Sequence, residues 1–156
     1  MYLYIMEVIL VRNILIIDDD VNIGNMIEEV LIKEGYIVSR AYSGTEALLH
    51  LNKNIPNLIL LDLMLPGISG EELLSKIKGI PIIVVSAKVD INNKVDVLLG
   101  GAVDYITKPF SIKELLARIT VQFRKESFSN NSNTVVFDDI IMDTKAHVVT
   151  VCGTIV

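Results

Sequence analysis

The residues that could do chemistry stand directly after short apolar segments. Asp18 and Asp19 follow the run ILII at 14–17, and Asp62 follows LILL at 58–61. Ending a buried segment in a carboxylate is costly unless a cation or hydrogen bonds compensate the charge. The placement therefore indicates that these carboxylates have a partner or a task.

A hydroxyl and an amine occupy similar places further along the chain. Ser86 follows IIVV at 82–85, and Lys108 comes shortly after VDYI at 103–106. Carboxylates that share a cleft repel each other unless a cation lies between them, and Mg²⁺ suits one or two carboxylates plus a phosphate oxygen. A lysine offers a point charge to a phosphoryl group, and an aspartate can carry one covalently. The set predicts Mg²⁺-dependent phosphoryl chemistry with Asp62 as the nucleophile.

Taken singly, each residue has a simpler explanation. Asp20 is best interpreted as a helix cap, Ser86 could bond to nearby backbone, and Lys108 could be a solvated loop lysine. Asp62 alone could be a turn residue. The joint placement of the carboxylates, the hydroxyl and the lysine favours one shared site.

Five short runs rich in Ile and Val are typical of buried strands. They are ILII (14–17), YIVSRA (36–41), LILL (58–61), IIVV (82–85) and VDYI (103–106). Segments with helical spacing lie between them, and their starts carry capping signals at Asp20, Ser43, Ser69, Asp90 and Ser111. This alternation predicts an α/β fold with a parallel sheet covered on both faces, and ligands bind beyond the carboxyl ends of such strands.

Composition narrows the class of protein. The 156 residues are 51% hydrophobic with a net charge of −5, and no run of Lys and Arg indicates a nucleic-acid surface. Cys152 is the one cysteine, so a reducing, cytoplasmic compartment is expected. The longest aliphatic runs are about four residues, too short to span a membrane.

The chain divides by composition into four predicted parts. Residues 1–12 form an extension or lead-in to the first strand, with Met1 or Met6 as the true start, and residues 13–125 form the α/β domain. The Ser/Asn-rich segment 126–133 is predicted to be a linker. Residues 134–156 are predicted to form short antiparallel strands.

Four motifs together resemble the receiver domain of two-component response regulators. They are DDD after the first strand, LLDLMLPGISG around Asp62, VVSAK, and DYITKPFS. The sequence KPFSIKELLARI resembles the OmpR/PhoB subfamily, and the tail resembles the small antiparallel sheet that opens its effector domain. The resemblance implies a flavodoxin-like fold with strand order 2-1-3-4-5 and five helices.

The resemblance also implies roles for individual residues. Asp62 would accept a phosphoryl group from a phosphohistidine on a sensor histidine kinase. Mg²⁺ would bind Asp18, Asp19, Asp62 and the backbone carbonyl of Met64. Such a protein assists its own phosphotransfer and dephosphorylation but is not a turnover enzyme.

Further roles concern the response to phosphorylation. Lys108 would pair with the phosphoryl oxygens, with a cis peptide bond to Pro109. Ser86 would turn its hydroxyl to the phosphoryl group, and Tyr105 would follow into the vacated space.

The subfamily then forms a homodimer through its fourth helix, fifth strand and fifth helix. The matching ion pairs here are Lys94 with Glu114 and Asp104 with Arg118, and they are expected to set register rather than drive assembly. Ile91, Val95 and Leu115 are expected to supply much of the affinity. Leu99 and Val103 stand where polar or acidic residues are common, which predicts a more apolar face. DNA binding is expected only of a longer parent, since a winged helix-turn-helix would begin after Val156.

Two other functions compete with this interpretation of the residues. An aspartyl-phosphate phosphatase of the haloacid dehalogenase type needs D-x-D-x-T at the first strand, whereas Val21-Asn22 follow the three aspartates here. A degenerate receiver would act as a constitutive interaction module, and Mg²⁺ titration separates this alternative because its pocket need not bind the ion.

Overall fold

A computed structural model describes residues 11–130 except Val89, together with four strands beyond them. For residues 127–130 and for those later strands the description covers the backbone alone. The chain divides into two units, residues 1–115 and 116–156.

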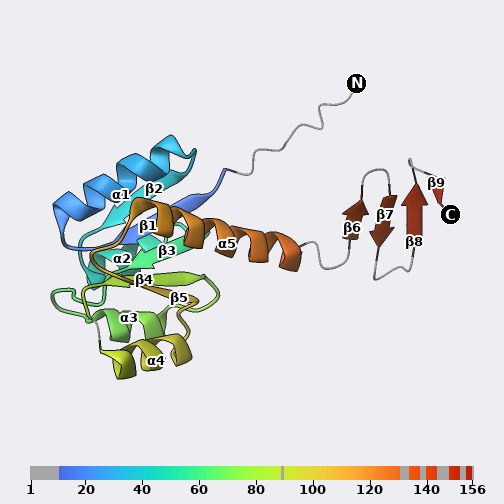
Figure 1. The fold of residues 1–156 in the computed structure, drawn as a ribbon. Coiled ribbons are helices and arrows are strands. Elements are labelled where there is room, and N and C mark those ends of the chain that lie inside the picture. Colours follow the sequence, from blue (N-terminus) through green and yellow to red (C-terminus); the bar gives the residue numbers. More distant parts are fainter. Residues whose placement is uncertain are drawn as a thin grey trace. The chain divides into compact units, whose positions relative to one another are not determined.

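Strands and helices alternate along the first part of the chain (Figure 1). In order they are β1 (Asn13–Ile17), α1 (Val21–Lys33), β2 (Ile37–Ala41), α2 (Gly44–Leu51), β3 (Leu58–Leu61), α3 (Gly70–Lys76), β4 (Ile82–Ser86), α4 (Ile91–Leu99), β5 (Asp104–Thr107) and α5 (Ile112–Asn130). The strands form one sheet in the order β2-β1-β3-β4-β5, and every neighbouring pair is parallel. The predicted flavodoxin-like topology is confirmed.

The sheet is buried on both faces because its central strands are apolar throughout. Side chains alternate between the two faces of a strand. Leu15 and Ile17 of β1 join one buried cluster with residues of α2, α3 and α4, among them Ala47, Leu73 and Val97. Helix α1, which buries its own apolar stripe, lies on the other side of the sheet from α3 and α4 (Figure 1).

The predicted capping residues start their helices. Ser43 and Ser69 each accept the backbone N–H three residues later at 3.1 Å. Asp20 accepts from the amides of Asn22 and Ile23, so its role as a cap is confirmed. Gly35 follows α1 with φ of 92°, a left-handed conformation that favours glycine.

The last helix continues further than composition suggests. Helix α5 extends to Asn130, so the first residues of the predicted linker 126–133 are helical. Ser and Asn lower helix propensity only moderately, so a composition signal alone does not place a helix end.

Beyond α5, the strands β6 (Thr134–Phe137), β7 (Ile140–Asp143), β8 (Val148–Val151) and β9 (Thr154–Ile155) pair in sequence order as an antiparallel sheet. The remaining residues of the tail, Cys152 and Val156 among them, lie outside the described part of the chain. In the described ranges, no helix is both long and apolar enough to cross a membrane.

Candidate functional site

Backbone hydrogen bonds fix the candidate residues at the carboxyl edge of the sheet. The amide of Asp18 donates to the carbonyl of Ala41, and the amide of Asp62 donates to that of Ile17. The amide of Lys108 donates in the same way to the carbonyl of Ser86 at 2.9 Å. The pairing of the sheet thus extends one step past the strands, so these side chains come from rigid positions.

The Lys108 ammonium lies between the two buried carboxylates. Its Nζ is 2.8 Å from Asp18 Oδ2 and 2.9 Å from Asp62 Oδ2. The exposed fractions of the three side chains are 12% for Lys108, 4% for Asp18 and 8% for Asp62. Two desolvated carboxylates therefore share one cation.

The other carboxylate oxygens accept hydrogen bonds from close by. Asp62 Oδ1 accepts from the Met64 amide at 2.9 Å and from Ser86 Oγ at 3.1 Å. Asp18 Oδ1 accepts from the Asp20 amide at 2.9 Å. Every oxygen of the two buried carboxylates thus has a partner, as buried polar atoms require.

The electrostatic balance leaves room for more positive charge. Burial raises the pKa of Asp18, the hydrogen bond from Lys108 opposes this, and the charge of Asp62 raises the pKa further, so that it lies above its usual value. Burial by itself lowers the pKa of Lys108, but its hydrogen bonds to Asp18 and Asp62 bring it above the ordinary value. The lysine therefore stays charged, and a further cation would relieve the repulsion between the carboxylates.

Three carboxylates could hold that cation. Oxygens of Asp18, Asp19 and Asp62 lie within 4.8 Å of one another, and Asp19 is exposed to solvent. An all-oxygen set with an open side suits Mg²⁺, which retains several waters. The residues present therefore fit the ion that the sequence predicts. The contribution of the Met64 carbonyl stays a prediction.

The loop after β3 passes very close to the start of α3. A Cβ at Gly70 would stand 2.3 Å from Leu63 Cα and 2.7 Å from the carbonyl oxygen of Asp62. The Gly70 amide donates to the carbonyl of Leu63 at 3.1 Å. A residue without a side chain is needed here, and this contact holds the loop that carries Asp62 against the helix.

Comparison with known proteins identifies the family of this chain. Residues 14–120 match the response regulator receiver domain. This chain belongs to that family.

Curated relatives are also response regulators. The chain is 39% identical over 145 residues to the DNA-binding response regulator MtrA of Mycobacterium tuberculosis, and the match covers 89% of this chain and 62% of that protein. The chain is 43% identical over 143 residues to the response regulator ArlR of Staphylococcus saprophyticus, and this match covers 90% of this chain and 64% of ArlR. The chain thus spans less than two thirds of these relatives.

Solved structures agree with this assignment. A CheY-like receiver domain from Methanospirillum hungatei has a TM-score of 0.73 and 33% identity, covering 76% of this chain and 98% of its own. DrrB of Thermotoga maritima, an OmpR/PhoB homologue, has a TM-score of 0.65 and 27% identity. The match covers 94% of this chain and 66% of DrrB. The OmpR/PhoB type inferred from the motifs is confirmed.

The receiver brings the predicted switch residue close to the acidic site, which we define as Asp18, Asp19, Asp62, Ser86 and Lys108. Tyr105 is buried, and its hydroxyl donates to the backbone carbonyl of Lys88. Burial raises the pKa of this phenol. The Lys94 ammonium stands 5.1 Å from the centre of the Tyr105 ring. The peptide bond between Lys108 and Pro109 is cis, as the resemblance implies.

One expectation for the dimer face is wrong. Leu115 is fully buried, so it cannot offer apolar surface to a second copy. It lies one helical turn before Ile119, which is fully buried as well, so the two share the buried face of α5. In and just after α4, apolar surface is instead offered by the exposed side chains of Ile91, Val95, Leu98, Leu99 and Val103.

Two residues near the site are not singled out by the sequence. Glu71 and Asn93 form a small cluster with Lys88, and we call these three residues the Lys88 cluster. Glu71 lies in the first turn of α3, where an acidic residue is usual for the helix dipole, so its type carries no special signal. Only the fold brings it to Lys88.

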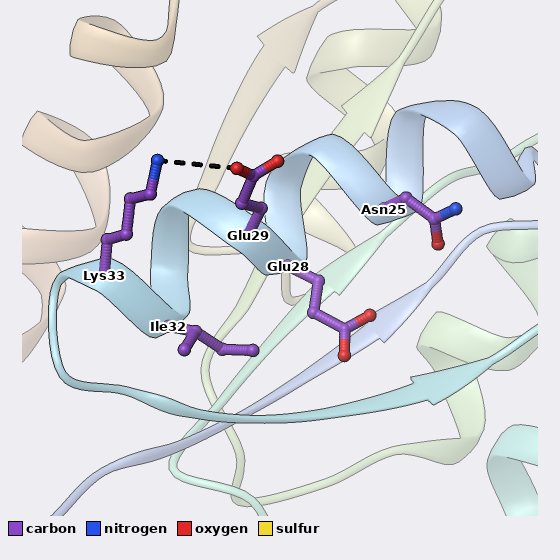
Figure 2. A pocket seen from close by; sticks show the side chains of 5 residues that line it. All are labelled: Asn25, Glu28, Glu29, Ile32 and Lys33. Carbon is purple, nitrogen blue, oxygen red and sulfur yellow. Dashed lines mark ion pairs between the residues drawn. The ribbon is translucent and has the colours of Figure 1, made fainter.

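One cavity of the described residues lies away from the acidic site. A surface cavity of about 420 Å³ lies along α1, lined by Asn25, Glu28, Glu29, Ile32 and Lys33 (Figure 2). The dashed line in Figure 2 marks an ion pair between Lys33 and Glu29, at 3.4 Å, and both side chains are exposed on the same helix. None of the residues of the acidic site lines it.

Proposed function

We propose that this receiver accepts a phosphoryl group on Asp62 from a phosphohistidine of a sensor histidine kinase. The observation that carries the proposal is the buried Asp62 carboxylate, held between Lys108 and Ser86 and next to two further aspartates. A carboxylate oxygen of Asp62 forms the new O–P bond as the N–P bond breaks, and the leaving imidazole takes up a proton.

Asp18, Asp19 and Asp62, with the Met64 carbonyl as a further ligand, would hold Mg²⁺, and the bound ion would supply positive charge beside the transferring group. Lys108 supplies the second positive charge, because its Nζ already contacts the nucleophile. Ser86 Oγ, 3.1 Å from Asp62, is close enough to donate to a phosphoryl oxygen after a small rotation. The chain's own residues thus orient the nucleophile and receive the added charge.

Phosphorylation adds about −1.5 to −2 of charge at the sheet edge. Ser86 turns toward that charge and Tyr105 occupies the buried position beside it. The change reaches the surface of α4 and β5, and the start of α5, where we propose that a second copy binds.

The dimer face combines ion pairs with apolar surface. Lys94 with Glu114 and Asp104 with Arg118 are the expected pairs between copies. Ile91 and Leu99 are 75% and 83% exposed, so α4 offers apolar area that a partner could cover. Burial of apolar area supplies the affinity, since exposed ion pairs contribute about 0–1 kcal/mol each.

We further propose that the full-length parent regulates transcription in the cytoplasm. The support is likeness to MtrA, which is described as a DNA-binding response regulator. The present chain spans 62% of that relative, so DNA binding would belong to a region outside it.

The test is the intact mass of the protein after incubation with a small phosphodonor, with and without Mg²⁺. Wild type is expected to gain one phosphate in the presence of Mg²⁺, and Asp62→Ala is expected to gain none. Asp20→Asn is the matched control, because Asp20 is a helix cap and asparagine caps equally well. No gain in wild type would contradict the proposal and favour the constitutive interaction module.

A further inference from the structure

Lys88 contacts the switch through its backbone and a helix through its side chain. Its amide lies 3.4 Å from Ser86 Oγ, and its carbonyl accepts the Tyr105 hydroxyl. Its Nζ donates to Glu71 Oε1 at 2.7 Å. Lys88 therefore binds the Tyr105 hydroxyl with its backbone carbonyl while its side chain is held by Glu71 of α3.

Glu71 links three elements at one oxygen. The same Oε1 that accepts from Lys88 lies 3.4 Å from Asn93 Nδ2 in the first turn of α4. Glu71 itself lies in the first turn of α3. It thus connects α3 with the β4–α4 loop and with α4.

The space around this link is loosely filled. A cavity of about 220 Å³ lies between α3 and α4, lined by Glu71, Leu74, Ser75, Asn93, Asp96, Val97 and Gly100. This cavity is partly open to solvent, so Glu71 and Asn93 meet at a groove between the two helices and not in the close-packed core.

The charges of the pair support the contact. The hydrogen bond to Glu71 raises the pKa of Lys88. Burial raises the pKa of Glu71, but the hydrogen bond and charge of Lys88 outweigh this and lower it. Both groups are charged near neutral pH.

We propose that Glu71 is a positioning residue that holds the Lys88 carbonyl where Tyr105 can bond to it, and so favours the buried position of Tyr105 before any phosphorylation. Its relevance to switching rests on the proposed function, in which the phosphorylated state uses that buried position. A surface ion pair of purely structural role would leave the position of Tyr105 unchanged.

The experiment uses ¹⁹F NMR of the protein labelled with 3-fluorotyrosine, in which Tyr105→Phe assigns the Tyr105 signal among the five tyrosines. The solvent isotope shift of that signal between H₂O and D₂O reports how far the ring is exposed. Glu71→Gln is expected to lower the ratio of buried to exposed Tyr105 roughly two- to fivefold, the range for a partly exposed pair. Asn93→Ala is expected to act in the same direction with a smaller change, since its contact is longer.

Two controls separate positioning from a general loss of charge. Glu72→Gln removes the neighbouring acid, which pairs with Lys76 at 3.7 Å on its own helix, and is expected to leave Tyr105 unchanged. The exchange Glu71→Lys with Lys88→Glu reverses the pair and is expected to restore the wild-type ratio.

The proposal is overturned if Glu71→Gln leaves the signal as in wild type, if Glu72→Gln changes it equally, or if the wild-type ring is solvent-exposed. None of these measurements needs phosphodonor or Mg²⁺. Failure of phosphorylation would therefore contradict the proposed function and leave the result on Glu71 standing.

Discussion

Two polar clusters border β4, and they differ in how much water reaches them. In the acidic site the charged side chains of Lys108, Asp18 and Asp62 are at most 12% exposed, and neighbouring amides hold the carboxylates in place. In the Lys88 cluster the exposed fractions are 44% for Lys88 and 34% for Glu71. Removing one partner of a buried ion pair leaves an uncompensated charge, whereas an exposed pair contributes little. The first cluster is suited to chemistry and the second to a modest conformational bias.

The largest expected effect comes from removing the shared cation. Lys108→Ala leaves Asp18 and Asp62 buried without their ammonium, and the free energy of unfolding without Mg²⁺ is expected to fall by about 3–5 kcal/mol. Lys88→Ala, the matched change in the exposed cluster, should cost about 0–1 kcal/mol. Urea denaturation of both variants measures the difference, and equal losses would remove the distinction between the clusters.

Added Mg²⁺ sharpens the same comparison. A cation that binds the folded carboxylates stabilises the folded state by mass action. The Lys108→Ala protein should therefore recover part of its stability in Mg²⁺, while Lys88→Ala should respond as wild type does. No recovery would mean that the carboxylates do not hold the ion.

A smaller effect is expected at Asp18, and its sign is opposite to that usual for an ion-paired carboxylate. The pKa of Asp18 in the folded protein is raised, so its ionisation at neutral pH favours the unfolded chain. The stabilising contribution of the protonated form is complete below the ordinary pKa of 3.8. It is lost as the pH rises through the pKa of the folded state. Asp18→Asn is neutral at all pH values and is expected to raise the melting temperature without Mg²⁺. It should also abolish the stabilisation by Mg²⁺. A lower melting temperature would show that the bond to Lys108 outweighs the burial of the charge.

The sequence predicts the acidic site well because its residues follow strands. Once LILL and ILII are assigned to a parallel sheet, Asp62 and Asp18 must meet at one edge, and the topology confirms this. The strands are recognisable because they are apolar throughout, which a sheet covered on both faces requires.

The Lys88 cluster could not be predicted in this way. Glu71 and Lys88 belong to a helix and a loop, and their meeting depends on how α3 is oriented, which no spacing in the sequence determines. Leu115 shows the same limit, since a helical stripe tells which residues share a face but not which of them the sheet covers. The sequence does not predict the extension of α5 to Asn130, because Ser and Asn are compatible with both a helix and a linker.

The smallest expected effect is the pH response of the Lys88 cluster. The pKa of Glu71 is lowered, so its contribution to stability is present above the ordinary value of 4.5 and is lost as pH falls through the folded value. Lys88 and Asn93 face it as donors, and Asp96 lines the same cavity. The ¹⁹F signal of Tyr105 should stay constant from neutral pH down to about 4.5, then move toward the exposed position.

The Glu71→Gln protein is the control for this titration, because its Tyr105 signal should lack that step. A step of equal size in both proteins would assign the pH response to other acids, Asp18 among them.

The most direct test of the central claim is the location of the phosphoryl group. Reduction of an aspartyl phosphate with borohydride converts the residue to homoserine, which peptide mass spectrometry can assign to a position. After incubation with phosphodonor and Mg²⁺, homoserine is expected at position 62 and nowhere else. Homoserine at position 18 or 19, or phosphate retained on another side chain such as His50, would contradict the account that Asp62 is the nucleophile of this receiver.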